Sequence, residues 1–430
     1  MSSPVDVLII GGGHAGVQAA FSLRDHDFRG SIRIVGAEAE LPYQRPPLSK
    51  SWLNGAVALE DILFRPAAVY DANSIDLRVD MRAEVIDRAA HQVHFSDRSH
   101  ANYGHLILAT GSRPRRLSIP GATLKGVCSL QNRADAASLA RGLDAAHSIV
   151  VIGGGFIGLE VAAAAAQRKL KVVVLEVAER VMQRAVSPLT SQFYRALHEA
   201  QGTRILHRTV ARALKGKDGR VEAVELQGGA SIPADLVVIG VGAEPVDDLA
   251  VKAGLRVENG VVVDEYLATS DPNISAIGDC ARFPAPDRQA LCRLESVQNA
   301  SDQARYVAMK LVGNPKPYVE VPWFWTEQLG CKLQIVGFPG NDDEQLLLGS
   351  PTEKCFTVLR WKNGRFMGGE GVKRPGDYAA VRKIMASGAA LSRDQALDPA
   401  FDLKSFARLC GASQTEHRGE PMRSIAALRQ

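Results

Sequence analysis

The fold is decided by two stretches of sequence, VDVLIIGGGHAGVQAAFSLRDHDFRGSIRIVGAE (residues 5–38) and SIVVIGGGFIGLEVAAAAAQRKLKVVVLEVAE (residues 148–179). Each consists of a β-branched run, a glycine turn, an alanine-rich segment and a second apolar run, and corresponding glycines lie 142 residues apart. This order predicts a strand–helix–strand unit in a buried parallel sheet. Two such units so far apart predict two nucleotide-binding domains.

The first stretch carries a dinucleotide-binding fingerprint at Gly11, Gly13 and Gly16. Such glycines allow a tight turn, close approach of the backbone to a pyrophosphate, and close packing of helix on strand, while the helix N-terminus favours phosphate. The fingerprint follows a strand and opens a helix, as this interpretation requires. The second strand is expected at 32–35, and Glu38 is the nearest candidate for the ribose-binding acid, although the sequence alone leaves that role open.

The second stretch carries the same fingerprint at Gly153, Gly155 and Gly158. Its second strand is expected at 172–175 and ends directly before Glu176. A carboxylate at this place can accept both ribose hydroxyls and would repel a 2′-phosphate, which favours NAD over NADP. Two dinucleotide sites in one chain imply that one nucleotide passes electrons to the other.

Length and composition set the class of protein. With 430 residues, and roughly 150 residues per domain, about three domains are expected. The apolar share of 46% and the charged share of 23% are typical of a globular protein, and the net charge of +4 is too small to indicate nucleic-acid binding. No apolar run is long enough for a membrane span, and the N-terminal run leads into the glycines like a first strand, so we expect a cytoplasmic protein.

The last quarter of the chain has a different pattern of predicted secondary structure. The residues Lys362-Asn363-Gly364 lie between two strand-like runs and predict a β-hairpin. The segment DYAAVRKIMASG, residues 377–388, follows as a helix. We therefore expect a third domain of the α+β type beginning near residue 321.

Several further motifs give the chain a family resemblance. The sequence resembles the FAD-dependent pyridine nucleotide reductases through ATGSRP at 109–114, VGAEP at 241–245 and Ile277-Gly278-Asp279. Within them it resembles the ferredoxin reductases of oxygenase systems through LPYQRPPLSK at 41–50, ESVQNA at 295–300 and VPWFWTEQ at 321–328. The resemblance covers nearly the whole chain, from Val5 to about Arg408.

This resemblance implies an α/β fold of the glutathione-reductase type with two Rossmann-like domains and a C-terminal α+β domain. The FAD-binding domain is expected to be discontinuous, at 1–110 and 245–320, with the NAD-binding domain at 111–244. The C-terminal domain is expected at 321–430.

The resemblance also implies which residues hold FAD. Asp279 is expected to bind the ribityl chain; a helix N-cap is the other interpretation, and both roles can hold together. Lys50 is expected near the flavin N5, and the preceding Pro46-Pro47 stiffens its loop, whereas a lone lysine would be a solvated surface residue. The other positions that match family contacts to FAD are Ala15, Ala83, Thr110, Gly111 and Val297.

One position departs from the family pattern. Where relatives carry an arginine that contacts FAD, this chain has Leu130-Gln131-Asn132, with Gln131 in the arginine's place. Whether the nearby Arg133 substitutes for it is left open.

The helix opened by Gly155 places Phe156 and Glu160 four residues apart on one face. The resemblance assigns both, with Gly242, to the nicotinamide side of the site. A Lys50–Glu160 ion pair at the floor of the hydride-transfer site is therefore our hypothesis, and an exposed helix glutamate is the alternative.

Residues near the flavin edge follow from the resemblance as well. Trp325, and after it Trp323, are expected beside the flavin, although an aromatic cluster is more often core packing. Arg65 and Arg305 match family positions near that edge and are candidate contacts for an acidic ferredoxin. Ordinary surface arginines are the alternative.

The function implied is an NADH-dependent ferredoxin reductase, in which hydride passes from NADH to FAD and single electrons then pass to a small acidic 2Fe–2S ferredoxin serving a cytochrome P450 or a Rieske oxygenase. Residues 1–127 contain no cysteine and the six cysteines form no CxxC pair, which argues against disulfide reductases and thiol peroxidases and against a zinc site. A rubredoxin reductase and a binding flavoprotein like apoptosis-inducing factor are the alternatives. A monomer or weak dimer is expected, without metal, nucleic acid or membrane.

Overall fold

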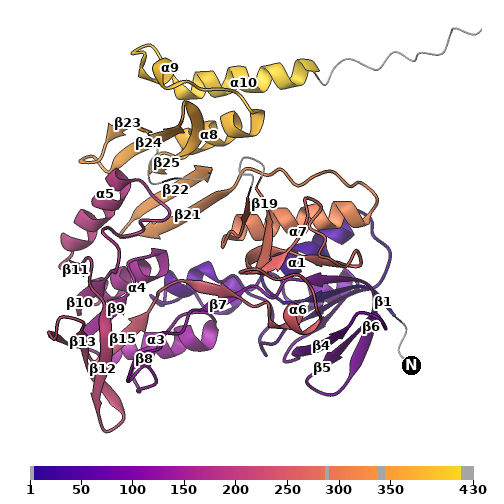
Figure 1. The fold of residues 1–430 in the computed structure, drawn as a ribbon, viewed down its shortest axis with the longest axis horizontal. Helices are drawn as coiled ribbons and strands as arrows, with labels where there is room; N and C mark the ends of the chain where they lie inside the picture. Colours follow the sequence, from indigo (N-terminus) through magenta and orange to yellow (C-terminus); the bar gives the residue numbers. More distant parts are fainter. Residues whose placement is uncertain (1–3, 286–289, 338–339, 341–343, 418–430) are drawn as a thin grey trace, which may run out of the picture. The chain divides into compact units, whose positions relative to one another are not determined.

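The computed structural model describes residues 4–285, 290–337, 340 and 344–417 (Figure 1). The chain forms two compact units, Met1–Val181 with Arg195–Glu320 and Met182–Tyr194 with Val321–Gln430. Both glycine fingerprints lie in the first unit, so its division into FAD- and NAD-binding domains stays a prediction.

The first sheet of the first unit is built around β1 (Val5–Ile10), the strand that precedes the first fingerprint. β1 pairs in parallel with β2 (Ile32–Val35) and β6 (His100–Leu108), and β6 pairs in parallel with β18 (Ile274–Ala276). A segment from much later in the sequence, β18, thus adds a strand to the N-terminal sheet. The sheet order is β3-β2-β1-β6-β5-β4 with β18 beside β6, and the other strands are β3 (Ile75–Arg78), β4 (Ala83–Asp87) and β5 (Gln92–Phe95).

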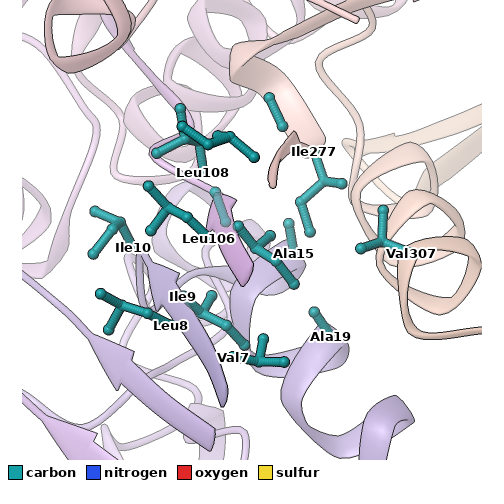
Figure 2. Packing of buried hydrophobic residues seen from close by; sticks show 14 of the residues in the cluster. Val7, Leu8, Ile9, Ile10, Ala15, Ala19, Leu106, Leu108, Ile277 and Val307 are labelled. Atoms are coloured by element: carbon teal, nitrogen blue, oxygen red, sulfur yellow. The ribbon is translucent and has the colours of Figure 1, made fainter. Parts of the chain in front are cut away.

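Side chains from β1 and β6 pack with α1 (His14–Asp25) and α7 (Val297–Leu311) in one core, shown in Figure 2. Ala15 and Ala19 are buried on α1, and such small side chains let a helix approach a sheet closely. Val307 reaches the same core from α7. Each buried aliphatic side chain contributes about 1.5–3 kcal/mol to the free energy of unfolding. This shared core therefore stabilises the packing of α7 against the N-terminal β1 and α1.

The second repeat lies in a separate parallel sheet of five strands, ordered β11-β10-β9-β15-β8. β9 (Ser148–Ile152) is followed by α4 (Phe156–Gln167) and β10 (Lys171–Leu175), which confirms the predicted strand–helix–strand order. The remaining elements of this region are β8 (Val127–Cys128), α3 (Arg133–Ala145), β11 (Arg204–Leu206), β15 (Leu236–Ile239) and an antiparallel sheet of β12 (Ala211–Lys217), β13 (Arg220–Leu226) and β14 (Ser231–Pro233).

Short elements of the first unit carry several of the candidate site residues. The 3₁₀ turn η1 (Pro46–Ser49) ends just before Lys50, and η3 (Gly278–Cys280) contains Asp279. The other short elements are η2 (Glu60–Ile62), α2 (Ala67–Ala72), β7 (Ser112–Pro114), β16 (Ala243–Pro245), α6 (Asp248–Lys252), β17 (Val261–Val262), β19 (Ala281–Pro284) and β20 (Leu291–Cys292).

The second unit is built on an antiparallel sheet in the order β21-β22-β25-β24-β23. The predicted hairpin is confirmed: Lys362 pairs with Arg365, and Asn363 and Gly364 between them have φ of 51° and 74°, as a tight hairpin turn requires. The elements are β21 (Trp323–Gln328), β22 (Cys331–Gly337), β23 (Glu344–Ser350), β24 (Cys355–Lys362), β25 (Arg365–Val372), α8 (Pro375–Ser387), α9 (Arg393–Leu397) and α10 (Leu403–His417). This is the expected α+β arrangement.

A buried carboxylate anchors residues 182–194 in the second unit. Glu370 is fully buried, and its Oε1 lies 2.5 Å from Nη1 of Arg360. The backbone N–H of Ser187 donates to both oxygens of Glu370 at 2.8 and 3.0 Å, just before α5 (Pro188–Glu199) begins. The NAD-binding domain expected at 111–244 includes this segment, but these contacts join Ser187 to the C-terminal sheet.

Strand β6 begins well before the apolar run at 106–108 with which it ends. Its residues from Tyr103 to Leu108 lie beside β1, whereas Asn102, Ala101 and His100 pair in antiparallel fashion with β5. The outer part alternates polar and apolar residues, so the apolar run alone did not reveal it. In the part of the chain that the structure describes, no helix has the length and apolar character needed to cross a membrane.

Candidate functional site

The first glycine loop has the backbone that a dinucleotide site needs. Gly11 has φ of 122°, and a Cβ there would collide with the carbonyl oxygen of Ala109. A Cβ at Gly16 would collide with the carbonyl of Gly11, so α1 can approach β1 only with glycine at this position. Gly13 caps α1 without a side-chain hydrogen bond, and a Cβ there would meet no protein atom within 4 Å. The start of α1 thus has no side-chain cap and lies beside open space, so its first N–H groups suit a phosphate.

The second loop repeats this geometry. Gly153 has φ of 109°, and a Cβ there would collide with the carbonyl of Gly240. A Cβ at Gly158 would collide with the carbonyl of Gly153, while one at Gly155 would meet no protein atom within 4 Å. α4 also begins without a side-chain cap. The second helix N-terminus is thus equally open to a phosphate.

The acid of the second repeat is held against its own glycine loop. Glu176 Oε2 accepts a hydrogen bond from the backbone N–H of Gly154 at 2.7 Å, and its Oε1 accepts one from Ala178 at 2.8 Å. Both bonds fix the carboxylate at the end of β10. This placement suits a ribose diol beside the loop.

The acid of the first repeat has side-chain partners instead. Glu38 Oε1 accepts from Nη2 of Arg45 at 2.5 Å, and the hydroxyl of Tyr43 donates to Oε2. Both partners belong to the LPYQRPPLSK segment. The predicted contact of Glu38 with the FAD ribose stays a prediction.

Asp279 lies close to the first glycine loop. A Cβ at Gly278 would lie 3.1 Å from Cβ of Ala15, so η3 touches the first turn of α1. The hydroxyl of Ser112 donates to Oδ2 of Asp279 at 2.8 Å. Burial raises the pKa of Asp279 to about 6, and the Ser112 bond opposes the rise. The cap residue of η3 is Ile277, so the alternative of Asp279 as an N-cap is wrong.

The predicted ion pair between Lys50 and Glu160 is present. Nζ of Lys50 lies 2.7 Å from Oε2 of Glu160. Glu160 is only 5% exposed, so the alternative of a solvated glutamate is wrong. The hydroxyl of Ser49 donates to the same oxygen at 2.5 Å. The pair thus joins the segment after the first repeat to the helix of the second, while its part in hydride transfer stays a prediction.

Gln131, the residue that departs from the family pattern, is held by hydrogen bonds to Ser112 and Arg45, and whether an arginine replaces the family contact to FAD stays a prediction. Nε2 of Gln131 donates to the carbonyl of Ser112 at 3.0 Å, and the Gln131 carbonyl accepts from Nη1 of Arg45 at 2.9 Å. The side chain of Arg133 is instead bound by Glu40, with Nε 2.8 Å from Oε1. Arg45, not Arg133, is therefore the cation that contacts residue 131.

The remaining predicted nucleotide contacts lie in loops and at the starts of elements. Gly111 and Gly242 have φ of 72° and 101°, which favours glycine at both turns. Thr110 Oγ1 donates to the carbonyl of Val246 at 2.5 Å. Ala83 begins β4, and Val297 begins α7. Their predicted contacts with the nucleotides stay predictions.

The two tryptophans lie on β21 of the second unit. Trp323 meets the ring of Tyr378 edge-on with centroids 5.2 Å apart, and the guanidinium of Arg382 lies 5.3 Å from the Trp323 centroid. Nζ of Lys332 lies 5.5 Å from the centroid of Trp325. Their predicted place beside the flavin stays a prediction.

Arg65 and Arg305 are exposed residues of the first unit. Nη1 of Arg65 donates to the carbonyl of Phe64 at 2.7 Å, and Nη1 of Arg305 lies 2.9 Å from Oδ1 of Asp302. Both guanidinium groups therefore remain at the surface, where a partner could reach them.

Three polar side chains were missed by the sequence analysis: Ser49, Arg45 and Ser112. Each binds a residue that was predicted, respectively Glu160, Glu38 and Asp279. All three lie inside motifs that were quoted, LPYQRPPLSK and ATGSRP. Ser49 and Ser112 bind residues 111 and 167 positions away, which no local pattern predicts. Arg45 and Glu38 are only seven residues apart, so their pairing was within reach of the sequence.

These residues fit two dinucleotides. The first glycine loop, together with Glu38 and Asp279, would hold FAD. The second loop, with Glu176 at the ribose and Glu160 on the nicotinamide side, would hold NAD. Within the described residues, no three His, Cys, Asp or Glu side chains are arranged to bind a metal ion.

Known proteins resemble the chain over nearly its whole length. Residues 5–304 match the family model described as pyridine nucleotide-disulphide oxidoreductase, and residues 323–407 match the model described as reductase C-terminal. Rhodocoxin reductase of Rhodococcus erythropolis is 45% identical over 400 residues, covering 93% of this chain and 94% of that protein.

Two solved structures are similar as well. The ferredoxin reductase for the CYP199A2 system from Rhodopseudomonas palustris aligns with a TM-score of 0.91 at 42% identity, covering 94% of this chain and 99% of that one. The covalent putidaredoxin reductase–putidaredoxin complex aligns with a TM-score of 0.91 at 36% identity, covering 96% and 100%.

Proposed function

This chain belongs to the pyridine nucleotide-disulphide oxidoreductase family, and we propose that it is an NADH-dependent ferredoxin reductase of an oxygenase system. Members of this family use FAD and a pyridine nucleotide, and the two glycine loops fit these cofactors. When both are bound to the protein, the cofactors supply the redox chemistry, in which hydride passes from NADH to FAD and single electrons pass on to an iron–sulfur partner.

The observation that carries the proposal is the Lys50–Glu160 ion pair at 2.7 Å. It joins the segment that follows the FAD-side repeat to the first turns of α4, where nicotinamide is expected. Lys50 holds a positive charge where the reduced flavin would be negative, and Glu160 fixes the direction of that ammonium group. The protein needs no nucleophile for this chemistry, and residues 1–127 offer no cysteine.

The other residues bind and orient the cofactors. The N–H groups at the starts of α1 and α4 bind the two pyrophosphates. Asp279, held by Ser112, binds the ribityl chain of FAD, and Glu176 binds the ribose of NADH while repelling a 2′-phosphate. Phe156 begins α4 and screens the nicotinamide pocket from water.

The proposed electron acceptor is a small acidic 2Fe–2S ferredoxin, which would supply a cytochrome P450 or a Rieske oxygenase. One similar structure is a complex of a reductase with putidaredoxin, which supports a partner of this kind. Arg65 and Arg305 are exposed and would attract acidic side chains, while Trp325 and Trp323 would line the flavin edge. We place the enzyme in the cytoplasm as a monomer or weak dimer.

The test is NADH-driven reduction of purified ferredoxins, followed at increasing salt. We expect an acidic 2Fe–2S ferredoxin to be reduced faster than cytochrome c, with a rate that falls as salt screens the docking charges. A rubredoxin measured in parallel tests the alternative acceptor. If every acceptor is reduced equally slowly and salt has no effect, the ferredoxin proposal is wrong and a binding flavoprotein becomes the better interpretation.

A further inference from the structure

Helix α4 is attached to the segment that carries Lys50 at two places. The first is the Lys50–Glu160 ion pair near the start of the helix. The second is at Arg168, the C-terminal cap residue of α4. The proposed chemistry uses only the first attachment, so the second needs its own explanation.

Arg168 binds two neighbouring residues of the Lys50 segment. Its Nη2 donates to the carbonyl of Leu53 at 2.7 Å, and its Nη1 donates to Oδ1 of Asn54 at 3.0 Å. Nδ2 of Asn54 in turn donates to Oε1 of Gln167 at 3.3 Å. A planar guanidinium with several donors suits such a double contact better than a lysine would. The end of α4 is therefore fixed to residues 53 and 54.

A short run of hydrogen bonds connects this attachment to Lys50. The backbone N–H of Asn54 donates to the carbonyl of Lys50 at 3.0 Å, and the N–H of Lys50 donates to the carbonyl of Pro47 at 3.0 Å. Leu53 is buried, with 1% of its surface exposed. A shift of Asn54 would therefore displace Lys50, because the turn between them is hydrogen-bonded and anchored.

We propose that Arg168 is a positioning residue for the reduction of FAD by NADH. By fixing residues 53 and 54 to the end of α4, it holds the Lys50 segment at a set distance from the face of the helix that carries Glu160. Arg168 lies eight residues beyond Glu160, about 12 Å along the helix axis, so it acts through Lys50 and not on the nicotinamide. The inference rests on the proposed role of the Lys50–Glu160 site.

A third contact of Arg168 provides the matched control. Its Nε lies 3.2 Å from Oδ1 of Asp144 on α3, whose side chain is 69% exposed. Such exposed ion pairs contribute little to the free energy of unfolding. Removing Asp144 takes away one partner of Arg168 but leaves its bonds to the Lys50 segment.

The experiment is anaerobic stopped-flow reduction of the FAD-loaded enzyme by NADH, without ferredoxin. We expect Arg168→Ala to lower the limiting rate about tenfold, since small misplacements of reacting groups cost up to about 100-fold. Asn54→Ala should lower it about threefold and Asp144→Ala should leave it unchanged. Arg168→Lys should restore part of the rate, because an ammonium group can still donate to the Leu53 carbonyl. The dissociation constant of NADH should change less than about twofold in all of them, because no nucleotide contact is removed.

Measurements besides activity separate positioning from folding. FAD content should match the wild type, melting temperatures should fall by no more than a few degrees for the hydrogen bonds removed, and each dithionite-reduced variant should reduce an external acceptor at the wild-type rate. An unchanged limiting rate in Arg168→Ala, or an equal loss in Asp144→Ala, overturns the inference. If Arg168→Ala loses FAD, the limiting rate of Asn54→Ala tests the inference instead: a lower rate supports it and an unchanged rate overturns it. Failure to reduce any ferredoxin, with normal reduction by NADH, would overturn the proposed function and leave this inference standing.

Discussion

The two glycine loops of the first unit have nearly the same backbone but different side chains around it. The cap residues Gly13 and Gly155 have φ, ψ of −85°, −168° and −80°, −176°, and each opens a helix of 12 residues without a side-chain cap. In both loops the first glycine has a positive φ. The backbone explains why both loops suit a dinucleotide, so the side chains must account for the different nucleotides that we propose for them.

Corresponding positions on the two helices show the difference. His14 stands where the second loop has Phe156, and Gln18 stands where it has Glu160. Nε2 of Gln18 donates to Ser22 within its own helix at 2.9 Å, whereas Glu160 reaches Lys50 outside its helix. At this position the first helix thus carries a neutral side chain bound within the helix, whereas the second carries a carboxylate that pairs with Lys50.

The largest effect should come from filling the phosphate space of one loop at a time. A Cβ at Gly13 or Gly155 meets no protein atom within 4 Å, so the Cβ of a valine at either position would enter ligand space without a clash in the protein. Gly155→Val should lower the rate of flavin reduction by NADH about 100-fold or more while FAD remains bound. Gly13→Val should instead yield protein without FAD.

Absorbance of bound flavin and titration with NADH check this prediction. If Gly155→Val lost FAD as readily as Gly13→Val, the assignment of one nucleotide to each loop would be wrong.

The next effect concerns the charge that only the second helix carries. Glu160→Ala leaves the ammonium group of Lys50, which is 20% exposed, without this carboxylate. We expect the limiting rate of flavin reduction by NADH to fall about 10- to 100-fold, with FAD still bound. Gln18→Ala, at the corresponding place on α1, is the control and should change the rate less than about twofold. Stopped-flow reduction that is unchanged in Glu160→Ala would contradict the proposed role of the pair.

The sequence predicted local structure well because its signals were local. The strands at 32–35 and 172–175, the hairpin at Lys362-Asn363-Gly364 and the side-by-side placement of Phe156 and Glu160 follow from periodicity and turn chemistry. The Lys50–Glu160 pair was reached through the family resemblance, since no spacing rule connects residues 110 positions apart.

Other contacts could not be predicted because they depend on tertiary packing. Ser187 is bound by Glu370, 183 residues away, which places residues 182–194 with the second unit. Arg45, not Arg133, contacts Gln131, although Arg133 is nearer in sequence. In both cases the partner depends on which distant segments come together in the fold. Local sequence patterns do not predict that.

A smaller effect should distinguish the two ribose acids. Glu176→Gln removes the charge that repels a 2′-phosphate and weakens the acceptor for the ribose hydroxyls. We expect NADH to bind about tenfold more weakly, and the preference for NADH over NADPH to fall by at least that factor. Glu38→Gln, at the end of the first repeat, should leave both nucleotide affinities unchanged and affect FAD retention instead. Parallel titrations with NADH and NADPH give the answer, and an unchanged preference in Glu176→Gln would contradict the assignment.

The smallest effect concerns the histidine that replaces Phe156 in the first loop. Burial lowers the pKa of His14 to about 4, and the positive charge of Arg45 contributes. Since the unfolded chain has a pKa near 6.5 at this residue, it binds a proton as the pH falls below about 6.5 while the folded protein does not until about pH 4. The folded state therefore loses stability over this interval, by about 1 kcal/mol between pH 7 and pH 5.5.

Replacing His14 by phenylalanine, the residue of the second loop, should remove this loss. The ring of His14 meets Phe64 edge-on with centroids 4.8 Å apart, a contact that a phenyl ring can keep. Urea unfolding of the FAD-free protein at pH 7 and pH 5.5 should give a pH dependence about 1 kcal/mol smaller in His14→Phe than in the wild type. The same replacement at exposed His26, just past the end of α1, controls for an added ring. An equal pH dependence in His14→Phe and wild type would show that His14 is protonated alike in the folded and unfolded states.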